Sequence, residues 1–193
     1  MADTTWLYGR IAVQFTLAEP MSDHARRMYN EAMTRLDDAD LLSRSLETQS
    51  DSQSLLRILG FEVLLKCALV LCGQTPKKNH VYAKLWRGLP GYAQKEILAA
   101  AQNRMPGHAD LTNLDRLFGW YQFVFERARY HFELYEKYSL EEQHELGSFW
   151  EELGAPIDEA VVQYHPNELT CLIDGLRIFI EARLYNTNAG PHY

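Results

Sequence analysis

The apolar stretch 55–72, LLRILGFEVLLKCALVLC, constrains the fold of this chain more than any other feature. A helix that spans a membrane needs about 20 residues with few charges, whereas this stretch is shorter and contains Arg57, Glu62 and Lys66. A surface helix would show a continuous polar face, which this pattern lacks. We therefore expect residues 55–72 to form the central helix of a soluble bundle, surrounded by other helices on most sides and ending at Gly73.

Glu62 and Lys66 lie four residues apart in this stretch, so a helix places them one turn apart on the same narrow stripe. One interpretation is an ordinary ion pair on the only strip of the helix that faces solvent. The other is a pair at a cleft or at an interface between subunits. The sequence is compatible with both.

The length and charge of the chain limit the kinds of protein it can be. Its 193 residues are enough for one domain that buries its own core without metal or disulfide support. The 19 basic and 26 acidic residues give a net charge of −7. This balance disfavours a protein that coats polyanions in general, although a local basic patch is compatible with it.

The cysteines and the N-terminus both favour the cytoplasm. Cys67, Cys72 and Cys171 are an odd number of thiols without paired spacing, which favours the reduced state. Gly9 and Arg10 interrupt the apolar run that a signal peptide would need. We expect a cytoplasmic protein with no membrane partner.

Residues 1–20 are expected to form an N-terminal arm. Between Ile11 and Leu17 apolar and polar side chains alternate, the pattern of a strand, and Pro20 closes the segment. Because one strand is not stable by itself, the arm is expected to be extended and either to pack on the bundle or to pair with a second chain.

The rest of the chain has the pattern of helices. Apart from the central helix, apolar stripes at helical spacing predict helices over residues 22–46, 80–89, 94–103, 112–135, 139–153 and from Pro166 onward. We predict an all-α protein, a single antiparallel helical bundle of five to seven helices. The bundle is expected to cover residues 21–186, with a flexible tail at 187–193.

Motifs that hold a metal or a cofactor are not found in the sequence. HExxH and CxxC do not occur, and the seven histidines are scattered. The phosphate-binding patterns GxxxxGK and GxGxxG and the nucleophile pattern GxSxG do not occur either. We expect neither a metal nor a cofactor.

The densest polar cluster is ERARYHFE, residues 126–133. On a continuous helix Arg127 and His131 share one face and Arg129 lies on another, so they cannot serve one pocket unless the helix breaks near Tyr130. A solvated surface explains such a cluster equally well. Arginine and histidine also suffice for metal-free RNA cleavage, because arginine stabilises charge on the reacting phosphate and histidine transfers a proton.

Three motifs, in order along the chain, resemble those of the HEPN superfamily. The first, similar to E-x-x-x-K, is FEVLLK at residues 61–66 with Gly73 after it. The second, similar to H-D-L-x-x-L, is HVYAKL at residues 80–85, and the third, similar to R-Y-x-x-E, is ARYHFE at residues 128–133. Together they span roughly residues 55–135. The resemblance implies a small all-α bundle that commonly dimerises, of a kind typical of prokaryotic toxin–antitoxin and defence systems.

The chain departs from the family pattern in two respects. Val81 stands where the second motif usually has aspartate. Catalytic members carry an arginine and a histidine with four to six residues between them. Here Arg127 and His131, and likewise Arg104 and His108, have three residues between them. The ribonuclease residues of the family therefore do not transfer position by position.

The resemblance implies instead a cleft that gathers polar residues from the three motifs. The candidate catalytic residues are Arg129, His131, Arg127 and His80. The candidate residues of the cleft and its ion network are Glu62, Lys66, Tyr130 and Glu133. A capping role in the turn stays open for His80, and a structural role for Arg129. A basic rim suited to RNA phosphate would comprise Lys77, Lys78, Lys84, Arg87, Arg127 and Arg129.

Three functions follow from these residues and the resemblance. The first is a HEPN-like homodimeric module for interaction or for sensing a nucleic acid or nucleotide, in a prokaryotic defence or toxin–antitoxin type system. The second is a metal-independent endoribonuclease with a divergent Arg/His site. The third is an inactive helical partner of a nucleotidyltransferase. The expected partners are a second copy of the chain, RNA or a nucleotide, and a nucleotidyltransferase.

Overall fold

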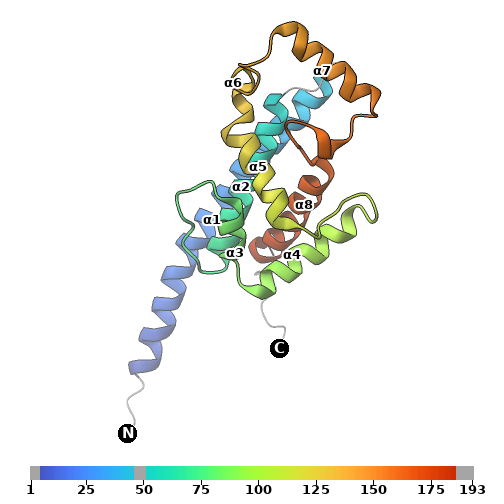
Figure 1. Ribbon diagram of the computed structural model, residues 1–193. Coiled ribbons are helices and arrows are strands. Elements are labelled where there is room, and N and C mark those ends of the chain that lie inside the picture. Colours follow the sequence, from blue (N-terminus) through green and yellow to red (C-terminus); the bar gives the residue numbers. More distant parts are fainter. Residues whose placement is uncertain (1–4, 46–50, 186–193) are drawn as a thin grey trace.

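The computed structural model describes residues 5–45 and 51–185, and every regular element in these ranges is helical (Figure 1). The α-helices are α1 (Thr5–Ser45), α2 (Asp51–Leu71), α3 (Tyr82–Arg87), α4 (Gly91–Arg104), α5 (Leu114–Glu126), α6 (His131–Leu134), α7 (Leu140–Glu152) and α8 (Pro166–Tyr185). Two short 3₁₀ helices are η1 (Ala128–Tyr130) and η2 (Ile157–Glu159). The predicted all-α class is confirmed. The predicted tail at 187–193 lies outside the described residues.

The N-terminal segment differs from the strand-like arm that the sequence predicts. Its backbone belongs to α1, which continues back to Thr5, and this half of the helix extends beyond the other helices (Figure 1). A strand needs a partner for its backbone groups, and no strand occurs within the described ranges to provide one. A helix satisfies those groups within its own segment. The alternation between Ile11 and Leu17 was therefore the wrong guide to its conformation.

The predicted central helix is α2, and it lies at the middle of the bundle. Ile58, Phe61, Leu64 and Leu65 are fully buried in it. Helix α1 packs along α2, α8 packs on α2 and on α4, and α3 and α5 complete the cover. Full burial of aliphatic and aromatic side chains of this size contributes roughly 1.5–3 kcal/mol each, so α2 organises the core.

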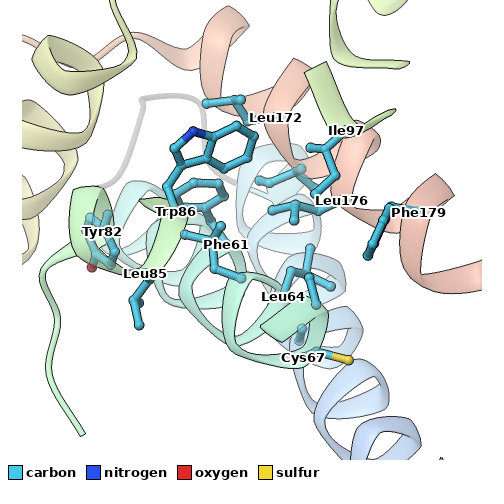
Figure 2. Close-up of a cluster of buried hydrophobic side chains, with 14 of the residues drawn as sticks. Phe61, Leu64, Cys67, Tyr82, Leu85, Trp86, Ile97, Leu172, Leu176 and Phe179 are labelled. Atoms are coloured by element: carbon cyan, nitrogen blue, oxygen red, sulfur yellow. The ribbon is translucent and has the colours of Figure 1, made fainter. Parts of the chain in front are cut away.

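An aromatic cluster joins α2 to α3 and α5. The Phe61 ring lies 5.9 Å from Tyr82, 6.0 Å from Phe118 and 6.0 Å from Tyr121, measured between ring centres. Figure 2 shows Tyr82 at one side of the buried cluster, Phe61 nearer its middle, and Ile97, Leu176 and Phe179 toward the other side. Edge-to-face and offset rings at these separations are favourable beyond the area they bury. The cluster therefore holds α3 and α5 against the middle of α2, next to Glu62.

Helices α4 and α8 approach each other closely at Gly175. A β-carbon at Gly175 would overlap the main-chain oxygen of Ile97 and lie 3.1 Å from the β-carbon of Ala101. Gly175 and Ala101 are small, so the two helix backbones can lie close together where the helices cross. The crossing holds the C-terminal helix against the bundle.

Candidate functional site

The candidate site is built around the buried carboxylate of Glu62. Glu62 is only 3% exposed, in the middle of α2. The Nζ of Lys66 donates to its Oε1 at 2.6 Å, which is the i,i+4 pair that the spacing predicts. A buried carboxylate needs such partners, because taking an unpaired charge out of water costs several kcal/mol. Glu62 and Lys66 therefore lie at a buried edge of the bundle and not on a solvent strip.

His80 is the second partner of Glu62. Its Nδ1 lies 2.8 Å from Oε2 and 3.0 Å from Oε1 of the carboxylate, although the two residues are 18 positions apart in the chain. A carboxylate only accepts hydrogen bonds, so Nδ1 carries the hydrogen and Nε2 is the nitrogen that can exchange a proton. The His80 side chain is 52% exposed, and its imidazole can therefore reach a ligand in solvent.

The polypeptide turns twice to bring His80 to this position. Helix α2 ends at Leu71, and Gly73, two residues further on, has a left-handed φ of +73° that suits glycine. The amide of Val81 donates to the side chain of Asn79 at 3.3 Å, so Asn79 orders the turn before α3. The side-chain hydrogen bond within this turn thus comes from Asn79, while the His80 side chain is bonded to Glu62.

Tyr82 lies beneath the carboxylate and was not singled out from the sequence. Its side chain is fully buried against Phe61. Burial, and after it the negative charge of Glu62, raises the pKa of Tyr82 far above its usual range. The phenol therefore stays protonated, so Tyr82 is an uncharged neighbour of the Glu62–Lys66 ion pair. In the sequence, the one feature that could have pointed to Tyr82 as part of the site is its position two residues after His80.

The helix that the sequence predicts over residues 112–135 is interrupted within the cluster at residues 126–133, a break that the sequence left open. Helix α5 ends at Glu126, η1 follows, and α6 begins at His131. The backbone amide of Arg127 still donates to Phe123 O at 2.8 Å, whereas the amide of Tyr130 bonds back to Arg127 O at 2.9 Å. The interruption changes the direction of the side chains after Arg127. Their relative positions therefore differ from those on one continuous helix.

Arg129 is turned toward the aromatic side chains next to His80. Its guanidinium carbon lies 5.4 Å from the centre of the Phe125 ring and 5.0 Å from the centre of the Tyr130 ring. The His80 ring lies 5.1 Å from the centre of the same Phe125 ring. Arg129 and His80 thus both lie against the Phe125 ring, and a guanidinium at such a distance from an aromatic face is favourable.

The remaining predicted residues lie around this arrangement. Arg127 and Glu133 are exposed, and no ion pair joins Arg129 to Glu133 among the described side chains. The backbone of His131 starts α6, and its side chain lies outside the described part of the structure. We define the Phe125 cluster as Glu62, Lys66, His80, Phe125, Arg129 and Tyr130.

A basic pocket of about 380 Å³ lies next to the cluster. Its charged lining residues are Lys77, Lys84 and Arg87, and its floor is apolar, from Leu69 and Leu85. Asn79, the residue before His80, also lines it. Most of the side chains that line the pocket are polar or charged. No acidic side chain belongs to the lining, so the pocket favours an anion.

The predicted basic rim is thus divided between two places. Lys77, Lys84 and Arg87 line the pocket, while Arg129 belongs to the Phe125 cluster. Arg87 is also held by Asp115 on α5, with its Nη2 2.8 Å from the carboxylate. Both side chains of that pair are largely exposed, so the pair orients Arg87 without neutralising it strongly.

Other kinds of site are not found in the described ranges. No group of three or more histidine, cysteine, aspartate or glutamate side chains there is arranged to hold a metal ion. None of the described helices is long and apolar enough to cross a membrane. Cys67, Cys72 and Cys171 are free thiols.

No family model, no curated protein and no solved structure matches this chain.

Proposed function

We propose that this chain is a HEPN-like homodimeric module that binds RNA or a nucleotide at the Phe125 cluster and the neighbouring basic pocket. One observation supports the proposal above all. Exposed cations and aromatic rings from three separate segments lie together beside the middle of α2, next to a pocket without acidic lining. The proposed homodimer, and the proposed place in a prokaryotic defence or toxin–antitoxin type system, are based on the resemblance to the HEPN superfamily.

The chemistry of the two features suits single-stranded RNA. Lysine and arginine attract phosphate, and unpaired bases stack on exposed aromatic rings and arginine planes. Tyr130 is 41% exposed next to Arg129, and Phe132, 6.2 Å from it between ring centres, is exposed as well. With a net charge of −7 the rest of the surface repels RNA. Binding is therefore expected to be local.

A binding measurement tests this proposal. The fluorescence anisotropy of a short labelled single-stranded RNA is titrated with the wild type, with Lys77→Ala/Lys84→Ala, and with Lys95→Ala. Lys95 is an exposed lysine on α4, outside the pocket. We expect the double variant to bind more weakly and to reduce the slope of log K against log salt by about 1.4, since each phosphate contact contributes about 0.7.

Lys95→Ala is expected to bind like the wild type. Equal affinity and equal salt dependence of all three proteins would contradict the proposal. Analytical ultracentrifugation of the same wild-type sample tests the homodimer separately, because it does not depend on RNA.

A second candidate function, a metal-independent endoribonuclease, is favoured by the pairing of Glu62 with His80. A carboxylate that accepts from Nδ1 orients an imidazole for proton transfer through Nε2. In this scheme Nε2 takes the proton of the ribose 2′-hydroxyl, and the 2′-oxygen attacks phosphorus. The bond to the 5′-oxygen breaks, the protonated Nε2 gives its proton to that oxygen, and the products are a cyclic 2′,3′-phosphate and a 5′-hydroxyl. Arg129 stabilises the charge on the phosphorane.

Cleavage of total RNA in the presence of EDTA tests the second candidate. His80→Ala and Arg129→Ala are expected to lose activity, and His131→Ala tests the other histidine that the sequence brings forward. His108→Ala, an exposed histidine outside the site, is the matched control. Circular dichroism shows whether each variant folds. Lack of cleavage by folded wild type over a broad range of RNAs would exclude this function and leave the binding module.

A further inference from the structure

Helix α7 presents an apolar face that nothing in the described part of the chain covers. The helix has no buried residue. Leu146, Phe149 and Leu153 are 48%, 60% and 53% exposed. They are spaced three and four residues apart, so they form one ridge along the helix. We call these three residues the α7 ridge.

Among the described side chains, the large exposed apolar residues are concentrated in the part of the sequence around this ridge. Seven of the thirteen large apolar side chains that are exposed in the described ranges lie within residues 138–161. They are Tyr138, Leu140, Leu146, Phe149, Leu153, Ile157 and Val161. Scattered exposed apolar residues need no explanation, whereas a contiguous group of them marks a docking surface.

The charged side chains of α7 are all acidic. Its 13 residues contain Glu141, Glu142, Glu145, Glu151 and Glu152 and neither lysine nor arginine. Glu141, Glu145 and Glu152 are four and seven residues apart, which puts them on a stripe that borders the ridge. A partner for this helix must therefore be apolar on one face and basic beside it.

Hydrogen bonds at both ends stabilise the helical conformation of α7. Ser139 and Glu142 form a reciprocal capping box, with Ser139 N donating to the Glu142 carboxylate at 2.7 Å and Glu142 N donating to Ser139 Oγ at 3.2 Å. At the other end Trp150 Nε1 donates to Pro156 O at 3.0 Å. The left-handed Gly154 (φ +85°) ends the helix. The ridge is thus held in helical form before any partner arrives, which lowers the entropy cost of docking.

The position of α7 leaves room for a partner. It lies at the end of the molecule opposite to the N-terminal half of α1 (Figure 1). It is also separate in sequence from the basic pocket, whose lining residues run from Leu69 to Gly88. Occupation of one surface therefore does not require the other.

We propose that the α7 ridge and its bordering glutamates form the docking site for a basic amphipathic helix of a partner protein. The apolar face of the partner helix covers Leu146, Phe149 and Leu153, and its lysines or arginines pair with Glu145 and Glu152. This is helix-on-helix recognition with apolar anchors three and four residues apart. Charge complementarity selects the partner, because an acidic helix would be repelled.

A synthetic amphipathic peptide made only of leucine and lysine is the probe. Its fluorescence anisotropy is measured against the wild type and against two variants of the site, Phe149→Ser/Leu153→Ser and Glu145→Lys/Glu152→Lys. The matched controls are Ile178→Ser, an exposed apolar residue of α8, and Asp37→Lys/Asp38→Lys, exposed carboxylates of α1. A second peptide with glutamate in place of every lysine tests the sign of the charge.

We expect the wild type and both controls to bind the lysine peptide and each site variant to lose at least ten-fold in affinity. The glutamate peptide is expected not to bind. Equal binding by the site variants, or no binding of the lysine peptide to folded wild type, would overturn the proposal. So would a self-associated wild type that Phe149→Ser/Leu153→Ser converts to a monomer, because the occupant would then be a second copy of the chain. Circular dichroism of each variant separates lost binding from lost folding.

Discussion

The carboxylate of Glu62, buried in α2, holds the half-exposed imidazole of His80 through Nδ1 at 2.8 Å. The same carboxylate accepts from Lys66 at 2.6 Å. One acidic side chain thus joins the central helix to the turn before α3. The turn also carries Lys77 and Asn79, which line the basic pocket, so its position depends on Glu62.

Replacement of Glu62 is therefore expected to cost more stability than replacement of His80. Glu62→Gln keeps the size of the side chain but removes the charge that Lys66 and His80 share. We expect a loss of about 1–3 kcal/mol in the free energy of unfolding. His80→Ala removes a half-exposed partner and should cost less than about 1 kcal/mol. Urea denaturation measures both, and a larger loss for His80→Ala would contradict this account of the turn.

The contact between Gly175 and α4 predicts opposite effects for two glycine substitutions. Gly175→Ala pushes a methyl group into the main chain of Ile97, which no rotamer change can relieve, and is expected to cost about 1–3 kcal/mol. Gly119→Ala adds a methyl group where nothing lies within 4 Å on α5 and should stabilise by about 0.5–1 kcal/mol. Circular dichroism during thermal melting gives the melting temperatures of both variants. If both substitutions change the melting temperature in the same direction, α4 and α8 do not cross as closely as described.

The pair between Glu96 and Arg183 predicts a pH dependence of stability. The Arg183 guanidinium donates to both carboxylate oxygens, at 2.9 and 2.8 Å, and lowers the pKa of Glu96. A carboxyl group with a lowered pKa stabilises the fold above its ordinary pKa, and this contribution is lost as the pH falls through the lowered value. Glu96 is partly exposed, so we expect Glu96→Gln to cost only about 0.5 kcal/mol at pH 7.

The difference between wild type and Glu96→Gln is expected to shrink below the ordinary glutamate pKa of 4.5. Urea denaturation at pH 7 and at successively lower pH follows it. A difference that grows on acidification would have the wrong sign for this pair.

The three thiols are expected to react at different rates. Burial raises the pKa of Cys67 to about 12, and burial also raises the pKa of Cys171. Cys72 at the end of α2 is only partly buried. Since the thiolate is the reactive form, iodoacetamide at pH 8 should modify Cys72 first and the other two only after denaturation. Peptide mass spectrometry identifies the modified sites, and early modification of Cys67 would contradict the packing of α2 on α1.

Leu65 tests the central position of α2. It is fully buried, and Leu65→Asp places an unpaired carboxylate in the bundle, which should abolish soluble folding. Ile178→Asp, at an exposed position of α8, should remain folded. A soluble Leu65→Asp variant with an unchanged melting curve would exclude the proposed architecture.

The sequence was most informative where the determining interactions are local. The apolar residues on nearly every side of the stretch 55–72 identified the central helix, and the spacing of Glu62 and Lys66 identified their pair. Both depend on the periodicity of a helix, which the chain itself carries. The N-terminal arm was misjudged for the converse reason. A strand is stable only with a partner far away in the sequence, and alternation alone does not show whether one exists.

The sequence by itself thus determined the helical class, the core helix and the types of residue that could form a site. The tertiary structure decided which of them meet. His80 reaches Glu62 only because the turn after Gly73 folds back, and Arg129 reaches the Phe125 ring beside His80 only because the helix breaks after Glu126. Turn geometry and packing between helices fix these contacts. They join residues that are distant in the chain, so no local pattern encodes them.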